Sequence, residues 1–204
     1  MPVSNKQQLD PYSAKAQNDN LTPQEKIIGL HSIVKAVKTG MLTTRSADGF
    51  FHSRAMAPAG PYSPTQASLM FVANRASDKF DEIQNDAHVN VSFFDESTTN
   101  WASYSGKARI LQDADKIDKH WSPALSAWFG NLGDNVHKGD QHDPRVALIE
   151  VIPSEIRYWT STQNAVTRAM NVAISAMTGD SAAPGELRTI TADEIQLLEG
   201  MRND

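Results

Sequence analysis

From Met41 onward the chain consists largely of short runs that favour β-strands, and this pattern constrains the fold most strongly. Seven such runs are rich in β-branched and aromatic residues: 41–46, 50–56, 68–73, 89–94, 103–111, 146–151 and 155–159. Turn-forming sequences separate them, for example Ala47-Asp48-Gly49 after the first run. Seven short strands divided by turns favour a barrel. We therefore expect a mainly β fold of the α+β type, with six to seven antiparallel strands.

Helices are expected on both sides of this β-rich region. Thr22 and Glu25 form a capping-box pattern with proline at position 23, and an amphipathic helix is predicted from there towards Gly40. Residues 114–121, residues 122–129, which begin with Ser-Pro, and residues 165–177 also have helical patterns. Thr191 and Glu194 predict the cap of a last helix. The polar stretch 130–145 is expected to be a surface loop and residues 179–185 a linker.

The chain has 204 residues, of which 40% are hydrophobic, so it is long enough to bury the core of one domain. The first twenty residues are polar and aperiodic, which is typical of a flexible arm. The predicted organisation is a flexible arm at 1–21, a barrel domain at 22–160 and a helical extension at 161–204.

Composition excludes several classes of function. The net charge is −5 and the basic residues are scattered, so a nucleic-acid surface is not expected. No apolar run approaches the ~18–20 residues of a membrane span, and the first twenty residues lack the apolar core of a signal peptide. Cysteine is absent, which excludes disulfides and thiolate chemistry. We expect a soluble cytoplasmic protein whose partner is a small molecule or another protein, and no membrane partner.

The segment 69–79, LMFVANRASDK, is the strongest candidate for a ligand site. Its apolar run stops at Ala73-Asn74 and is followed by a predicted helix start that carries Lys79 in the first turn. Unpaired N–H groups and a partial positive charge at a helix N-terminus favour an anion such as phosphate, and disfavour a lysine without one. Ser77 is expected to be the N-cap and to add a hydroxyl. The alternative is an ordinary solvated helix start.

Four segments together resemble a known family. MFVANRASDK is similar to the strand, turn and helix start that bind the FMN phosphate in the pyridoxamine-phosphate oxidase family of split β-barrels. Three further segments agree in order and spacing: Arg54-Ala55-Met56, Gly106-Lys107-Ala108 and Pro153-x-x-Ile156-Arg157-Tyr158-Trp159. Trp121, the pair Trp128-Phe129 and the tail 183–188 resemble the general-stress-protein branch and its fungal blue-light-inducible relatives. The resemblance implies an FMN-binding split barrel with flanking helices.

The resemblance also implies roles for individual residues. Lys79 and Ser77 would bind the FMN phosphate, and Arg54 would reach it from the neighbouring strand. Backbone groups of four further residues would contact the cofactor, with the first two beneath the isoalloxazine ring: Ala55, Met56, Val72 and Ala73. Trp159 would come from the second subunit, because in this family the cofactor lies at a dimer interface. A homodimer is therefore expected.

Three departures from the family pattern concern the chemistry. Asp78 stands where the oxidase has a basic residue, so one positive charge fewer faces the phosphate. Trp101 stands where the oxidase has a glutamine that contacts the flavin. Residues 160–165, TSTQNA, replace the Arg-x-His-x-Arg motif that grips the vitamin substrate. Oxidation of pyridoxamine phosphate is therefore not expected.

Alternative interpretations remain for the other candidate residues. Arg54 would otherwise form a structural ion pair, and Trp159 would otherwise belong to the core. Trp121, Trp128 and Phe129 have near-helical spacing, which favours core or dimer interface over a flavin lid. His137 and His142 lie in a loop with acidic residues, but no third well-placed ligand supports a metal site there, and none is expected. No catalytic residue can be identified from the sequence.

Three hypotheses for function follow. The first is a flavin-dependent oxidoreductase that takes electrons from a reduced nicotinamide, passes them to a small acceptor and is linked to stress or light response. The second is a non-catalytic flavin binder that stores or senses the cofactor. The third is a split barrel without flavin, which serves as a dimeric scaffold or binds a heme-like or deazaflavin cofactor.

Overall fold

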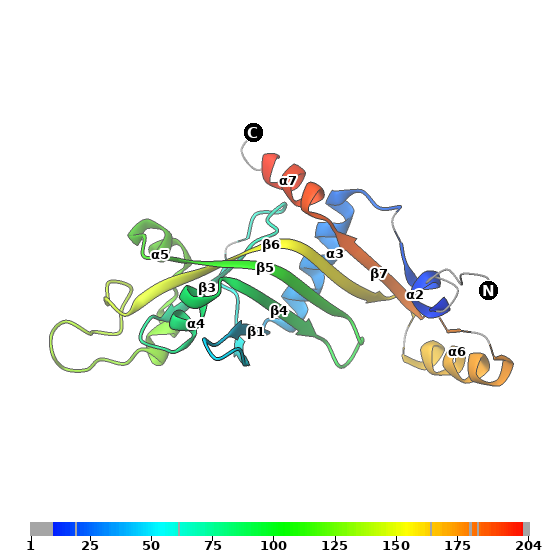
Figure 1. Ribbon diagram of the computed structural model, residues 1–204, viewed down its shortest axis with the longest axis horizontal. Helices are drawn as coiled ribbons and strands as arrows, with labels where there is room; N and C mark the ends of the chain where they lie inside the picture. Colours follow the sequence, from blue (N-terminus) through cyan, green and yellow to red (C-terminus); the bar gives the residue numbers. More distant parts are fainter. Residues whose placement is uncertain are drawn as a thin grey trace.

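A strongly curled antiparallel sheet forms the centre of the molecule, with helices around it (Figure 1). The computed structural model describes residues 10–18, 20–60, 62–163, 165–179, 181, 182 and 184–201. Residues 1–9 of the expected arm, Pro61 of an expected turn, and Asn164 and Ala183 of the expected motifs lie outside the described residues.

The strands of the sheet are β1 (Gly40–Arg45), β2 (Phe51–Met56), β3 (Leu69–Asn74), β4 (His88–Phe94), β5 (Trp101–Leu111), β6 (Val146–Ser161) and β7 (Gly185–Ile190). Their order is β2-β1-β4-β5-β6-β3, and β7 pairs with the far end of β6. Every pairing between these strands is antiparallel. The expected split barrel of the α+β type is confirmed.

The helices are α2 (Pro11–Ala16), α3 (Pro23–Val37), α4 (Lys79–Asn85), α5 (Ala114–His120), the 3₁₀ helix η1 (Pro123–Trp128), α6 (Ala165–Thr178) and α7 (Ala192–Gly200). The capping boxes expected at Thr22 and Thr191 are both present. Helix α2 lies within the segment expected to be a flexible arm, and its neighbour Gln17 bridges to Leu187 of β7. No helix among the described residues is long and apolar enough to cross a membrane.

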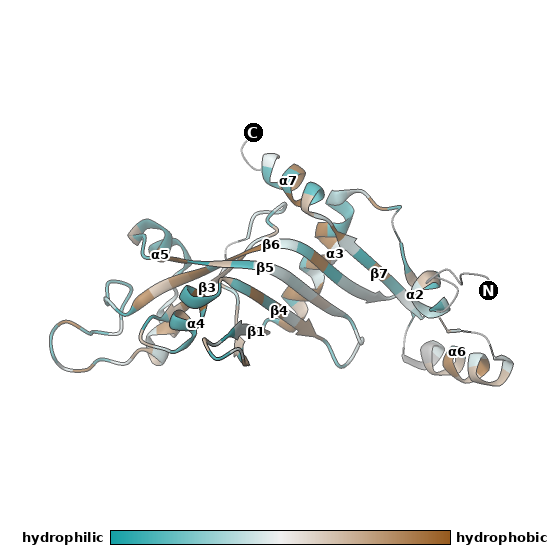
Figure 2. Ribbon diagram, in the orientation of Figure 1, coloured by the Kyte–Doolittle hydropathy of each residue, from teal (hydrophilic) through white to brown (hydrophobic). Residues whose placement is uncertain are grey.

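Two apolar cores hold these elements together. The larger fills the barrel between α3 and the inner face of the sheet, and it includes the fully buried Leu30, Phe71 and Ile149. The smaller lies on the outer face of β3 and β6, where Met70 and Leu148 pack against Ile117 of α5 and against Phe129. Figure 2 shows apolar colouring along the first part of β6.

The long strand β6 corrects one expectation from the sequence. Residues 146–151 and 155–159 were expected to be separate strands, although Pro153 between them has no N–H for the sheet in either case. The chain instead continues as one strand through Pro153. The β5–β6 register shifts between Ser105 and Gly106, which leaves Ser154 of β6 without a partner on β5. A Cβ on Gly106 would lie 2.1 Å from the carbonyl oxygen of Ile152, so the close approach requires glycine.

The seventh strand is β7 rather than one of the seven expected runs. It begins at Gly185, where the linker was expected to end, and runs beside β6 to Ile190. A Cβ on Gly185 would come within 2.7 Å of the Trp159 ring, so glycine allows β7 to pass this side chain.

Candidate functional site

The β3–α4 turn brings Ser77 and Lys79 together. The Ser77 hydroxyl donates to the Asn74 carbonyl at 2.6 Å, and the Lys79 ammonium donates to the same hydroxyl. The expectation that Ser77 is the N-cap is wrong: helix α4 begins at Lys79, and Asp78 is its N-cap residue. The Ser77 hydroxyl instead donates to the Asn74 carbonyl and accepts from the Lys79 ammonium, and the turn continues past Ser77 before the helix begins.

Arg54 approaches this turn from β2. Its guanidinium donates to Glu82 of α4 at 2.8 Å and to the Thr44 hydroxyl of β1. Because α4 follows β3, these contacts join the two edge strands of the sheet, β2 and β3, through one helix. The curl of the sheet thereby places Arg54 close to Lys79, although they are 25 positions apart in sequence.

Glu82 is the buried centre of this cluster. Its side chain is 8% exposed and accepts from His52 Nδ1 at 2.5 Å, from Arg54 at 2.8 Å and from the Thr44 hydroxyl. Burial alone would raise the pKa of Glu82, but these three hydrogen bonds and the Arg54 charge outweigh it and lower the pKa to about 2. Glu82 is therefore a carboxylate at neutral pH.

Burial also affects Lys79, and its pKa is lowered from its ordinary value. Half-burial is the largest cause and the charge of nearby Arg54 adds to it, while Asp78 and Glu82 act in the opposite direction. The two cations therefore repel each other in a partly desolvated place. An anion between them would offset both effects.

The sequence pattern did not identify His52, Glu82 or Thr44 as members of this cluster. Two weak signals were present. His52 is two residues before Arg54 and thus lies on the same face of β2, and Glu82 is three residues after Lys79 on α4. Neither spacing reveals that the strand and the helix meet.

The other expected site residues lie in two places. Ala55 and Met56 follow Arg54 on β2, and Val72 and Ala73 lie on β3 shortly before the turn. Trp159 is remote from them, because Ala73 pairs with Ala147 and Trp159 is twelve residues further along β6. At about 3.3 Å per residue this is about 40 Å along the strand.

Trp159 is 6% exposed and its ring stacks on Tyr12 of α2, with centroids 5.6 Å apart and an interplanar angle of 13°. Trp101, at the position of the oxidase glutamine, lies directly opposite Trp159 in the β5–β6 pair. Both tryptophans therefore belong to the end of the sheet where β7 pairs with β6.

Of the three aromatic residues near α5, two pack together. Trp121 and Phe129 have ring centroids 5.6 Å apart and belong to the smaller core, whereas Trp128 is 82% exposed. In the expected loop His137 contacts Asp134 at 2.6 Å. The described residues contain no group of three or more His, Cys, Asp or Glu side chains that could bind a metal ion.

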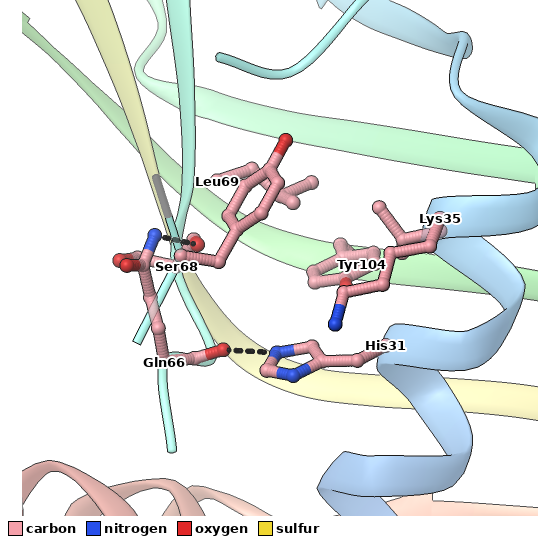
Figure 3. Close-up of a pocket in the computed structure, with 8 residues that line it drawn as sticks. His31, Lys35, Gln66, Ser68, Leu69 and Tyr104 are labelled. Atoms are coloured by element: carbon pink, nitrogen blue, oxygen red, sulfur yellow. Dashed lines mark hydrogen bonds between the residues drawn. The ribbon is translucent and has the colours of Figure 1, made fainter. Parts of the chain in front are cut away.

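A small pocket between α3 and the segment before β3 has room for about one water molecule (Figure 3). His31 and Gln66 close it, with His31 Nε2 2.8 Å from the Gln66 carbonyl oxygen. Burial, the largest cause, lowers the pKa of His31, which favours the neutral ring as the donor to this carbonyl. The hydrogen bond between His31 and Gln66 ties the segment before β3 to α3. The pocket itself is too small for a cofactor.

Comparison with known proteins identifies the family. The model of the family described as pyridoxamine 5'-phosphate oxidase like matches residues 25–183, most of the chain. The chain belongs to the pyridoxamine 5'-phosphate oxidase-like family. It is also 40% identical over 188 residues to "Protein bli-3" of Neurospora crassa, with 92% of this chain and 90% of that protein covered.

Two solved structures illustrate the relatives of this family member. General Stress Protein 26 from Bacillus anthracis is 26% identical with a TM-score of 0.53, covering 66% of this chain and 92% of that one. A pyridoxamine 5'-phosphate oxidase-related, FMN binding protein from Nostoc punctiforme is 15% identical with a TM-score of 0.52. The match covers 84% of this chain and 97% of that one. The second likeness supports the fold alone. The expected resemblance to this superfamily, its general-stress branch and the fungal relative is confirmed.

Proposed function

We propose that the chain binds FMN and that Lys79, Ser77 and Arg54 hold the phosphate. One observation carries this proposal: an ammonium, a hydroxyl and a guanidinium from two separate elements gather at the β3–α4 turn. The family supports it, because one structural relative is described as an FMN binding protein. Guanidinium and ammonium groups suit phosphate oxygens because they supply charge-assisted hydrogen bonds.

The charge balance of the cluster fits a phosphate. Glu82 compensates Arg54 through the 2.8 Å ion pair, so the structural ion pair considered for Arg54 is present. Lys79 has no such partner within hydrogen-bond distance among the described residues, since its ammonium donates to the neutral Ser77 hydroxyl. A bound phosphate would therefore form an ion pair with Lys79. Glu82 and Thr44 would hold the Arg54 guanidinium in a fixed orientation beside it.

The remaining cofactor contacts would come from two subunits. Backbone groups of Ala55, Met56, Val72 and Ala73 would contact the flavin from the chain that binds the phosphate. Trp159 is about 40 Å along β6 from Ala147, the partner of Ala73, so it would reach the same cofactor from a second copy of the chain. This separation supports a homodimer with FMN at the subunit interface.

Bound FMN would supply the redox chemistry, and the chain would bind it, orient it and exclude water. We propose that the protein is a flavin-dependent oxidoreductase that accepts electrons from a reduced nicotinamide and passes them to a small acceptor. Its similarity to General Stress Protein 26 supports a link to stress response. A link to light response follows from the resemblance to the fungal blue-light-inducible proteins. The missing Arg-x-His-x-Arg motif argues against oxidation of pyridoxamine phosphate.

The phosphate site is tested by titrating FMN into wild type and the Lys79→Ala variant while following flavin fluorescence. Loss of a charged hydrogen bond worth about 1.5–3 kcal/mol should weaken FMN binding about 10- to 100-fold. Lys138→Ala removes an exposed lysine from the 130–145 loop and serves as the matched control, with no change expected. Equal FMN affinity in Lys79→Ala and wild type would overturn the assigned phosphate site.

A second experiment separates catalysis from storage or sensing. Reduced nicotinamide is added anaerobically to the FMN-loaded protein, and the flavin absorbance near its visible maximum is followed. Bleaching supports the oxidoreductase. Retained yellow colour would contradict nicotinamide as the donor and favour the non-catalytic flavin binder.

A further inference from the structure

A second polar cavity lies on the outer face of the sheet, away from the Lys79 turn. It has a volume of about 520 Å³ and lies between α5, the ends of β5 and β6, and the segment that joins β2 to β3. This volume is within the usual range of small-molecule sites. Met70 contributes to its floor, near the start of β3, whereas the Lys79 turn follows the end of that strand. The cavity and the turn are therefore at opposite ends of β3.

Positive charge dominates the cavity lining. Arg109, Lys116 and Lys119 contribute cations, and Glu150 is the one carboxylate in the lining. Glu150 is 2.5 Å from Arg109 Nε, so the Arg109 charge is compensated. Glu150 does not compensate the two lysines of the lining, in a chain whose net charge is −5.

The two lysines face the cavity together. Lys116 and Lys119 are three residues apart on α5, which places them on the same side of the helix. Lys116 is 3.9 Å from Asp113, but both side chains are nearly half exposed, so this pair contributes little. Lys119 makes no ion pair with any of the described residues. Lys119 lies in the last turn of α5, where the helix dipole favours a cation. The dipole explains neither Lys116, which is earlier in the helix, nor the presence of the cavity.

Hydrogen bonds fix the walls of the cavity. His120 Nδ1 is 2.9 Å from the Gly60 carbonyl oxygen, which ties the end of α5 to the segment between β2 and β3. The Ala59 amide donates to the Met70 carbonyl at 2.6 Å and ties the same segment to β3. Gln66 donates to the Ser68 carbonyl at 2.9 Å, and His31 holds Gln66 from the other side (Figure 3). A cavity whose walls are held in this way is pre-organised, which lowers the cost of binding a ligand.

From this arrangement we infer that the cavity is a second ligand site, which binds a small molecule through its phosphoryl group. A phosphomonoester carries nearly two negative charges at pH 7, which matches Lys119 and the weakly paired Lys116. Lysine binds phosphate as a point charge, and Tyr62 and Ser63 add hydroxyl groups to the lining. The site does not depend on the FMN proposal, since it shares no side chain with the Lys79 cluster.

The experiment is isothermal titration calorimetry on the full chain with FMN present in excess. The probes are AMP and glycerol 3-phosphate, with succinate as a carboxylate of similar charge. Binding of both phosphorylated probes would show recognition of the phosphoryl group alone, and binding of AMP only would show recognition of a nucleotide. Binding of neither, or of succinate equally well, would overturn the proposal.

Variants locate the site and separate it from the FMN site. Lys116→Gln/Lys119→Gln should weaken binding of the phosphorylated probe by about tenfold or more, and raised salt should weaken it in wild type. The same double variant should bind FMN as wild type does. Lys79→Ala should weaken FMN binding and leave binding of the phosphorylated probe unchanged. Lys138→Ala should change neither FMN binding nor probe binding. Probe binding that falls in Lys79→Ala but persists in the double variant would assign the ligand to the FMN site and overturn the inference.

Because both lysines are exposed, the double variant should fold, and its thermal unfolding midpoint provides the check. A second variant, Arg109→Gln, removes the compensated cation and leaves Glu150 in the cavity. Arg109→Gln should bind the phosphorylated probe more weakly than wild type does, since the unpaired Glu150 carboxylate would then repel the phosphoryl group. Unchanged or tighter binding in this variant would contradict the charge argument.

Discussion

Replacing Glu82 by glutamine tests the buried cluster that orients Arg54. Glutamine has nearly the same shape but no charge, so Glu82→Gln removes the ionic partner of Arg54 without creating a cavity. The lowering of the Glu82 pKa from its ordinary 4.5 to about 2 corresponds to about 3 kcal/mol at about 1.36 kcal/mol per pKa unit. Breaking a buried ion pair by removing one partner has a cost of similar size, about 3–5 kcal/mol.

The assay is urea unfolding of wild type and variant, monitored by circular dichroism. At pH 7 the free energy of unfolding should fall by about 3 kcal/mol, which lowers the urea midpoint by roughly 1 M at a typical dependence on urea. Glu155→Gln is the matched control, because Glu155 pairs with Arg157 at the surface, where both side chains are over 40% exposed. That change should cost less than about 1 kcal/mol.

The same cluster predicts how the difference depends on pH. The folded-state pKa of Glu82 is depressed, so its contribution is fully present above about 4.5 and is lost as the pH falls towards about 2. Wild type and Glu82→Gln should therefore converge in stability over that range. A loss below about 1 kcal/mol at pH 7, or a difference that persists unchanged near pH 2, would refute the role assigned to Glu82.

Two further changes test other parts of the fold. Gly106→Ala should lower the free energy of unfolding by at least about 2 kcal/mol, measured by urea unfolding, because its Cβ would lie 2.1 Å from the Ile152 carbonyl oxygen; wild-type stability would show that the bulge tolerates a side chain. Asp143→Asn should expose the 130–145 loop to limited proteolysis, because Asp143 is buried, binds Arg145 at 2.7 Å and accepts the Gly139 amide at 2.8 Å; an unchanged cleavage rate would contradict this.

Local signals made the helices predictable. Thr22 and Thr191 cap their helices through hydrogen bonds to residues three positions later, so the sequence nearby contains the whole interaction. Strand boundaries depend on partners instead. Pro153 continues β6 only because Gly106 of another strand allows the bulge, and β7 is visible only once β6 is there to pair with it.

The candidate site was predictable in part for the same reason. Lys79 and Ser77 are two residues apart and their proximity follows from the turn, whereas Glu82 meets Arg54 across 28 positions through the curl of the sheet. The position of Trp159 at the far end of β6 follows from strand length and register. Neither the length of β6 nor its register can be read from residues 153–159, the motif that contains Trp159.

The most direct test of the central claim compares FMN with riboflavin, which lacks the phosphate. Both are titrated into the wild-type protein under identical conditions, and the dissociation constants are measured from flavin fluorescence. If Lys79, Ser77 and Arg54 hold the phosphate, FMN should bind about tenfold or more tighter than riboflavin, and added salt should reduce the difference. Equal affinity for the two flavins would contradict the account.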